Sequence, residues 1–251
     1  MRFFLLFILW AAAGITPALA AGLSPEPVYR WKKCLTSEGL TLYWSKVEGS
    51  EIIAFRAEGI VDAPIEKVAS VVLDKNRGTE WVNSLLESKV IREISSTEFI
   101  EYDRMAAPPL SAQRDFVSRV RVDSNPLERR ITVQYRSEAD PLTPPLSKCV
   151  RGDIACEFKM VPMTLADQTY VQTEIFCDPK GGIPKWVVNF FQQGWPQTTF
   201  ANLRKQVKKA DIQVLPVVEK LLQVPPMKVV EKKESPRGHS IRPRTAGGEK
   251  L

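Results

Sequence analysis

The stretch that decides the fold reads DPKGGIPKWVVNFFQQGWPQTTFANLRKQV and covers residues 178–207. Within this stretch, Ile183 and Pro184 begin a predicted helix, because proline suits the first turn of a helix. Apolar residues then recur at helical spacing as far as Val207, which predicts a long C-terminal helix with one apolar face. We expect Gly194 and Pro196 to break or bend this helix in its middle.

The chain before this helix consists mostly of segments in which apolar and polar residues alternate. This period of two is typical of half-buried β-strands, and the short connections favour antiparallel pairing. At least seven strands are expected, near residues 40–44, 52–60, 99–105, 116–122, 131–136, 150–161 and 168–177. One further helix is predicted over residues 65–73, with Asp62 as its N-cap and Pro64 in its first turn.

These elements predict an α+β fold in which a curved antiparallel β-sheet wraps around the C-terminal helix. Such an interior is either filled by side chains or left open for a ligand. The length of 251 residues, with 44% hydrophobic and 25% charged residues, excludes collagen-like, wholly disordered and multi-span membrane proteins. A single histidine, His239, excludes catalytic triads and zinc sites that need several imidazoles.

Both ends of the chain differ from the body. Residues 1–20 have a basic start, an apolar run of 11 residues and small residues at Ala18 and Ala20, as in a cleaved signal peptide. A short membrane anchor is the alternative, although about 20 apolar residues are needed to span a bilayer. The predicted mature protein is therefore periplasmic or secreted.

Residues 224–251 carry seven Lys/Arg against three Asp/Glu and no aromatic residue, which predicts a disordered basic tail. This tail is either simply solvated, which we favour, or a weak tether to anionic lipid. Nucleic acid is not expected as a partner, because the tail lacks interleaved aromatic residues. The remaining residues, 21–223, are predicted to form one domain.

In this order and spacing, the pieces of that domain resemble the START domain, the lipid-binding module of the helix-grip superfamily. The resemblance runs from about Tyr29 to about Val207. The motifs that carry it are GL at 39–40, VEGS at 47–50, GIVDAP at 59–64, EW at 80–81, QRDFV at 113–117, VR at 150–151, DPKGGIPKWVVN at 178–189 and NLRK at 202–205. It implies a helix-grip fold with a hydrophobic tunnel that holds a lipid.

The resemblance also turns expected core positions into expected lipid-binding positions. Strand parity predicts that six apolar strand residues face the tunnel: Phe116, Val120, Val133, Phe158, Met160 and Ile175. On the C-terminal helix, Phe190, Phe200 and Leu203 are expected to face them. Met105 is expected to add a pliable wall. Ordinary core packing is the alternative for each of these residues.

A polar lipid head would need a polar partner inside the tunnel. Asp103 lies where the family commonly places a buried acid, but the position of its usual cationic partner is Val120, between Arg119 and Arg121. Either a bulge turns one arginine inward or the tunnel is less polar here; a surface arginine is the commoner outcome.

Four cysteines could form disulfides in an exported protein. If a hairpin folds about residues 165–168, Cys156 lies opposite Cys177, which leaves Cys34 to pair with Cys149. Buried free thiols are the alternative. No C-x₂-C spacing occurs, so we expect no metal, and we expect no cofactor.

The sequence thus predicts a monomeric lipid carrier that contacts membranes transiently, and no catalytic residues. One alternative is a tunnel enzyme, cyclase-like or hydrolase-like, that recruits Tyr102 and Asp103. Another is a lipid-responsive sensor or adaptor that docks through its tail.

Overall fold

The computed structural model describes residues 28–107, 111–164 and 167–224. The predicted signal peptide and residues 225–251 of the predicted tail lie outside the described residues.

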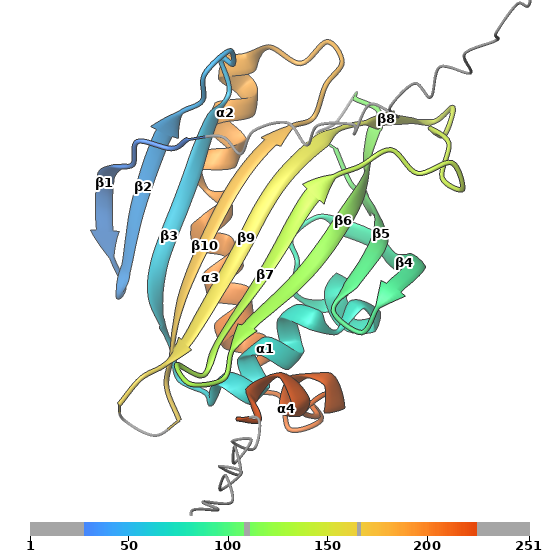
Figure 1. The fold of residues 1–251 in the computed structure, drawn as a ribbon. Coiled ribbons are helices and arrows are strands. Elements are labelled where there is room, and N and C mark those ends of the chain that lie inside the picture. The colour runs from blue at the N-terminus through green and yellow to red at the C-terminus, as the bar shows by residue number, and fades with distance from the viewer. Residues whose placement is uncertain (1–27, 108–110, 165–166, 225–251) are drawn as a thin grey trace, which may run out of the picture.

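Ten strands of the described chain form one curved sheet (Figure 1). The strands are β1 (Lys32–Ser37), β2 (Leu40–Lys46), β3 (Ile53–Val61), β4 (Leu85–Ser95), β5 (Glu98–Met105), β6 (Gln113–Asn125), β7 (Arg130–Ser137), β8 (Cys149–Arg151), β9 (Asp153–Pro162) and β10 (Thr169–Asp178). They follow the order β1-β2-β3-β10-β9-β7-β6-β5-β4, antiparallel throughout, while the short β8 pairs in parallel with β6. The predicted α+β architecture is confirmed.

The helices cover the concave face of this sheet and its lower end (Figure 1). They are α1 (Ile65–Leu73), the 3₁₀ helix η1 (Lys75–Glu80), α2 (Lys185–Gln193), α3 (Trp195–Gln206) and α4 (Pro216–Leu222). No helix among the described residues is long and apolar enough to cross a bilayer.

The predicted break in the C-terminal helix is confirmed. Gly194 ends α2, and α3 begins at Trp195 with Pro196 in its first turn, where its missing N–H is not needed. The predicted N-cap of α1 is wrong. Pro64 occupies that position, and Asp62 Oδ1 instead accepts a hydrogen bond from Gln168 Nε2 at 2.8 Å.

The lower part of the interior is tightly packed. Phe200 and Leu203 on α3 are 1% and 0% exposed, and Phe200 lies directly over Gly59 of β3. A Cβ atom at Gly59 would come within 3.2 Å of the Phe200 ring and 2.4 Å of the Leu40 side chain. The glycine therefore lets α3 approach the sheet closely.

The predicted disulfide pairs are not formed, and all four cysteines, which lie within the described ranges, are free thiols. In the β9–β10 register Cys156 pairs with Ile175 and Cys177 with Ile154, so the two thiols lie on diagonal positions rather than opposite each other. Cys34 lies on edge strand β1, whereas Cys149 lies on β8 beside β6, several strands away.

Candidate functional site

Above the packed part, the space between the sheet and the helices is hollow. An inner chamber of about 170 Å³ lies against β5, β7, β9 and β10 and is covered by η1 and α3. A wider vestibule of about 480 Å³ lies between α2 and the segment that follows β5. Four residues line both spaces, Met105, Cys177, Gln192 and Trp195, so the two hollows adjoin.

Several residues predicted to face a tunnel line these hollows. Asp103, Met105, Phe158 and Ile175 line the inner chamber, and Phe116 and again Met105 line the vestibule. Five others are buried among the core side chains and do not line either hollow: Val120, Val133, Met160, Phe200 and Leu203. Their role in binding stays a prediction.

The predicted inward orientation of Phe190 is wrong. Its side chain is 70% exposed, and that of Trp186, one turn earlier on α2, is 73% exposed. Val187, Val188 and Phe191 turn toward the vestibule instead. The outer and inner faces of α2 are therefore both apolar, and sequence periodicity did not reveal which of them meets the sheet.

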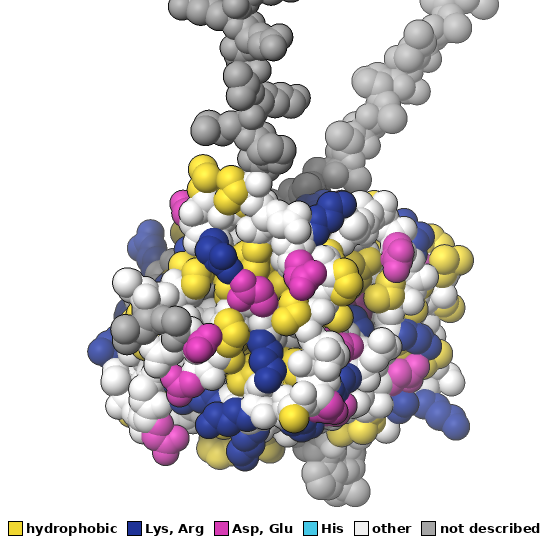
Figure 2. All heavy atoms as spheres, turned by 90° about the horizontal axis from the view of Figure 1, so that it is seen from below, with side chains coloured by type: hydrophobic (Ala, Val, Ile, Leu, Met, Phe, Trp, Pro, Cys, Tyr) yellow, Lys and Arg dark blue, Asp and Glu magenta, His cyan; other side chains and the backbone are white. Residues whose placement is uncertain are grey.

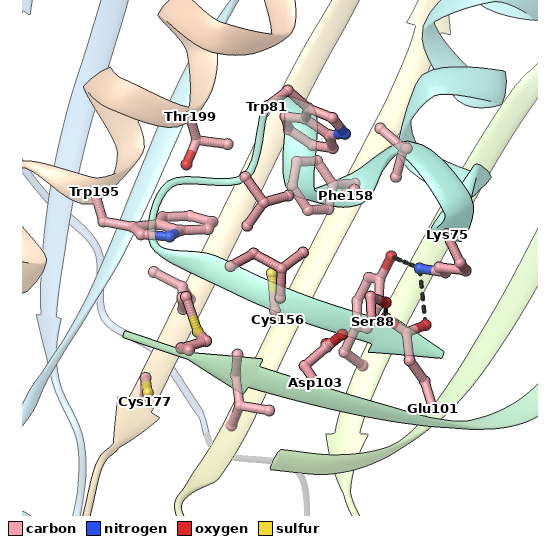
Figure 3. Close-up of a pocket in the computed structure, with 18 of the residues that line it drawn as sticks. Lys75, Trp81, Ser88, Glu101, Asp103, Cys156, Phe158, Cys177, Trp195 and Thr199 are labelled. Atoms are coloured by element: carbon pink, nitrogen blue, oxygen red, sulfur yellow. Dashed lines mark hydrogen bonds and ion pairs between the residues drawn. The ribbon is translucent and has the colours of Figure 1, made fainter. Parts of the chain in front are cut away.

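One end of the inner chamber is polar. Lys75 Nζ lies 2.8 Å from Glu101 Oε2 and donates a hydrogen bond to the Tyr135 hydroxyl, also at 2.8 Å. Ser88 Oγ donates to Glu101 Oε1 at 3.3 Å. Asp103 stands beside this group, and its Oδ1 has no hydrogen-bond partner among the described residues. Figure 3 shows Lys75, Ser88, Glu101 and Asp103 gathered at the end of the chamber away from Trp195.

Burial and charge set the protonation of this cluster. Burial, followed by the neighbouring charge of Glu101, raises the pKa of Asp103 well above its ordinary value. Burial lowers the pKa of Lys75, but the surrounding charges, above all that of Glu101, outweigh burial and hold this pKa above its ordinary value. The arrangement therefore favours a charged Lys75 and a protonated Asp103.

Sequence reasoning missed Lys75 and Glu101. Glu101 had a usable signal, because it lies two residues before Asp103 on the same strand and so points to the same face. Lys75 had none, since it follows α1 in a short 3₁₀ helix and meets β5 and β7 only in the folded chain.

Arg119 and Arg121, the two arginines considered as cationic partners of Asp103, point away from the hollow. Val120 is fully buried, while Arg119 pairs with Glu138 and, at 2.7 Å, with Glu98. Arg121 also pairs with Glu98, at 3.0 Å, and is exposed. The surface position that the sequence favoured for these arginines is confirmed, and Lys75 supplies the cation inside.

The two thiols that line the inner chamber are poor nucleophiles. Burial raises the pKa of Cys156 and that of Cys177 to about 12 each. Because the thiolate is the reactive form of cysteine, both side chains serve as apolar wall at neutral pH. Together with Trp81, Phe158 and Ile175, they make most of the remaining chamber wall apolar, while Thr199 and Gln192 add polar groups near α3.

Comparisons with known proteins agree with this geometry. A family model described as START domain matches residues 28–206. StAR-related lipid transfer protein 5 of Mus musculus is 26% identical over 188 residues, which cover 71% of this chain and 86% of that protein. An uncharacterized protein of Pseudomonas aeruginosa is 26% identical over 184 residues, which cover 71% of this chain and 87% of the relative.

Two solved structures share both the fold and moderate sequence identity. Human StAR-related lipid transfer protein 5 is 28% identical, with a TM-score of 0.66, over 71% of this chain and 86% of that one. A fragment of a STAR-related lipid transfer protein from Xanthomonas axonopodis is 27% identical, with a TM-score of 0.64, over 71% and 99%.

Proposed function

Because the chain belongs to the START domain family, we propose that it binds a lipid in the hollow under α2 and α3 and carries it between membranes outside the cytoplasm. The observation that carries this proposal is the apolar inner chamber that adjoins a wider vestibule. Exposing one CH₂ group to water costs about 0.8 kcal/mol, so a 16-carbon chain would cost about 12 kcal/mol if left uncovered. A carrier must therefore enclose its lipid.

The sizes of the two spaces indicate how a lipid would be held. The inner chamber, of about 170 Å³, is similar to a cavity of about 150 Å³ that takes up a benzene molecule. It holds one end of a lipid, and the remainder occupies the vestibule. Entry of a larger lipid then requires α2 to move outward.

The outer face of α2 supports a transient membrane contact. Large apolar side chains are normally covered in a folded protein, yet Trp186 and Phe190 are more than two-thirds exposed. Aromatic side chains of this kind suit the membrane interface. The opposite end of the molecule, seen in Figure 2, instead carries acidic and basic side chains interspersed with small hydrophobic areas. We propose that α2 rests on the bilayer while the lipid enters or leaves.

The remaining parts of the proposal rest on the sequence. The predicted signal peptide supports a periplasmic or secreted carrier, which acts as a monomer. Binding without catalysis is supported by the protonated thiols in the hollow and by the position of the one histidine, His239, in the tail.

Lipid transfer between vesicles tests the proposal. The wild-type protein should accelerate transfer of a fluorescent lipid from donor to acceptor vesicles. Cys177→Trp should abolish it, because the indole fills the place where chamber and vestibule adjoin. Cys34→Trp, on exposed edge strand β1, is the matched control and should transfer normally. A wild-type protein with no transfer, or equal loss in both variants, would contradict the proposal.

A further inference from the structure

The loop between β7 and β8, residues 138–148, is apolar although it is exposed. Five of the six residues at its tip are apolar and lie open to solvent: Pro141, Leu142, Pro144, Pro145 and Leu146. The side chains of Leu142 and Leu146 are 70% and 49% exposed. Single exposed leucines are common on protein surfaces, whereas clustered apolar residues mark surfaces that another molecule covers.

Buried polar contacts hold this loop in place. Asp140 Oδ2 lies 2.7 Å from Arg92 Nη2 of β4, and the Asp140 side chain is 1% exposed. Arg151 of β8 donates hydrogen bonds to Thr143 O at 3.3 Å. The same guanidinium group forms a bidentate pair, at 3.0 and 2.9 Å, with Asp115, which is fully buried in β6. Because the loop is fixed at two points, its apolar tip is kept on the outside of the molecule.

The loop lies at the same end of the molecule as α2 (Figure 1). Contacts connect the two along this end. Asp153 Oδ2, at the start of β9, lies 2.9 Å from Lys180 Nζ in the segment before α2. In the same segment, a Cβ atom at Gly181 would lie 3.6 Å from the Val150 side chain of β8. The apolar loop tip and the exposed aromatic side chains of α2 therefore belong to one continuous end of the molecule.

We propose that the β7–β8 loop is a second membrane contact, in which Leu142 and Leu146 enter the lipid interface while α2 rests on the same bilayer. This inference rests on the proposed function, because it adds a surface to the membrane contact of the same carrier. The chemistry of the loop suits a bilayer. Residues 141–147 carry no charge, and the exposed Lys148 follows them. An apolar tip can enter the acyl region while an adjacent lysine keeps its ammonium group among the phosphates.

A second contact would fix the orientation of the carrier. A protein that touches a bilayer through α2 alone can tilt about the axis of that helix. A contact at the β7–β8 loop, farther along the same end, prevents this tilt. It thereby sets the direction in which the vestibule beside α2 opens.

Vesicle binding tests the loop with a matched pair of variants. Leu142→Ser should weaken sedimentation with vesicles of phosphatidylethanolamine and phosphatidylglycerol about tenfold, since burying a leucine side chain contributes about 1.5–3 kcal/mol. Leu127→Ser is the same change in the β6–β7 turn, at the opposite end of the molecule (Figure 1) and at an 82% exposed site. It should bind vesicles as wild type does.

A substitution that strengthens binding cannot be explained by a folding defect. Leu142→Trp should bind the same vesicles more tightly than wild type, because an indole ring suits the membrane interface. Vesicles with brominated acyl chains should also quench the fluorescence of the indole introduced at position 142. Leu127→Trp should show neither the tighter binding nor the additional quenching.

The outcomes separate this inference from the proposed function. Vesicle binding at the wild-type level by Leu142→Ser, or no additional quenching in Leu142→Trp, overturns the inference and leaves a carrier that docks through α2. A wild-type protein that neither binds vesicles nor transfers lipid overturns both. A wild-type dimer in sedimentation velocity that Leu142→Ser dissociates, with vesicle binding unchanged, would assign the loop to a second copy of the chain and also overturn the inference.

Discussion

The two helices on either side of Gly194 differ in a way that composition does not predict, because α2 is richer in apolar residues yet α3 buries its apolar residues more deeply. α3 buries Phe200 and Leu203 completely against the lower part of the sheet. α2, over the hollow, has Val188 as its one buried residue and leaves Trp186 and Phe190 in solvent.

The attachments of the two helices differ in the same way. α2 is held to the β2–β3 connection by hydrogen bonds of the Asn189 side chain, which accepts from Ile53 N and donates to Glu51 O, each at 3.0 Å. α3 is held both by close apolar packing over Gly59 and by hydrogen bonds from Asn202 to Trp81 O and from Arg204 to Ile60 O. We therefore expect α3, whose apolar side chains are buried, to contribute more to the free energy of unfolding than α2.

The largest expected effect tests this difference directly. Phe200→Ala should destabilise the protein by about 3–5 kcal/mol, because it leaves a cavity in a packed region. Trp186→Ala, on α2, should change the free energy of unfolding by no more than about 0.5 kcal/mol. Urea unfolding followed by circular dichroism measures both, and comparable losses would show that α2 is as much part of the core as α3.

A second prediction concerns membrane binding by the exposed face of α2. Trp186→Ser with Phe190→Ser should weaken binding to lipid vesicles about tenfold or more, since each aromatic side chain contributes about 1.5–3 kcal/mol when buried. Sedimentation with vesicles gives the affinity. Leu127→Ser, at an 82% exposed site at the other end of the molecule, is the control. Unchanged sedimentation of the double variant would refute a docking role for α2.

A third prediction concerns Asp103, whose buried carboxyl group should make the stability of the protein depend on pH. The pKa of Asp103 is raised in the folded protein, so the folded state keeps a proton that the unfolded chain releases above its ordinary pKa of about 3.9. The stability contribution of this proton is complete below that ordinary value and is lost as the pH rises through the folded value.

Asp103→Asn should remove this pH dependence. Urea unfolding at a series of pH values should show wild type losing stability relative to Asp103→Asn as the pH increases. Asp123→Asn, at an exposed site on β6, should follow wild type. Parallel curves for wild type and Asp103→Asn would argue against a buried, protonated Asp103.

The smallest expected effect lies at the junction of the two helices. Gly194 has helical angles, φ −84° and ψ −12°, and a Cβ atom there would meet nothing within 4 Å. Gly194→Ala should stabilise the protein by about 0.5–1 kcal/mol and slow lipid transfer if α2 moves about this point. Destabilisation would contradict the predicted gain in stability. Transfer at the wild-type rate in a stabilised variant would place the moving joint elsewhere.

The sequence was sufficient for elements whose pattern is local. Alternation identified the central strands, and Gly194 with Pro196 identified the helix break. Edge strands β1 and β4 were missed because edge residues are largely exposed and need not alternate. The predicted register of β9 and β10 was wrong, because the length of the loop between them, and not the strand pattern, decides which residues pair.

The candidate site was less predictable for a physical reason. Parity placed Phe158 and Ile175 correctly on the concave face, and the family resemblance placed Asp103 there. Periodicity cannot distinguish a filled core from a hollow. Lys75 reaches Glu101 and Tyr135 across elements that are distant in the sequence, so its role depends on tertiary structure alone.

The most direct test of a lipid-filled hollow is mass spectrometry of the organic extract of the purified protein. The account predicts one lipid per chain of the wild-type protein, and no lipid in Cys177→Trp. A wild-type protein that carries no lipid and takes none up from vesicles would contradict it.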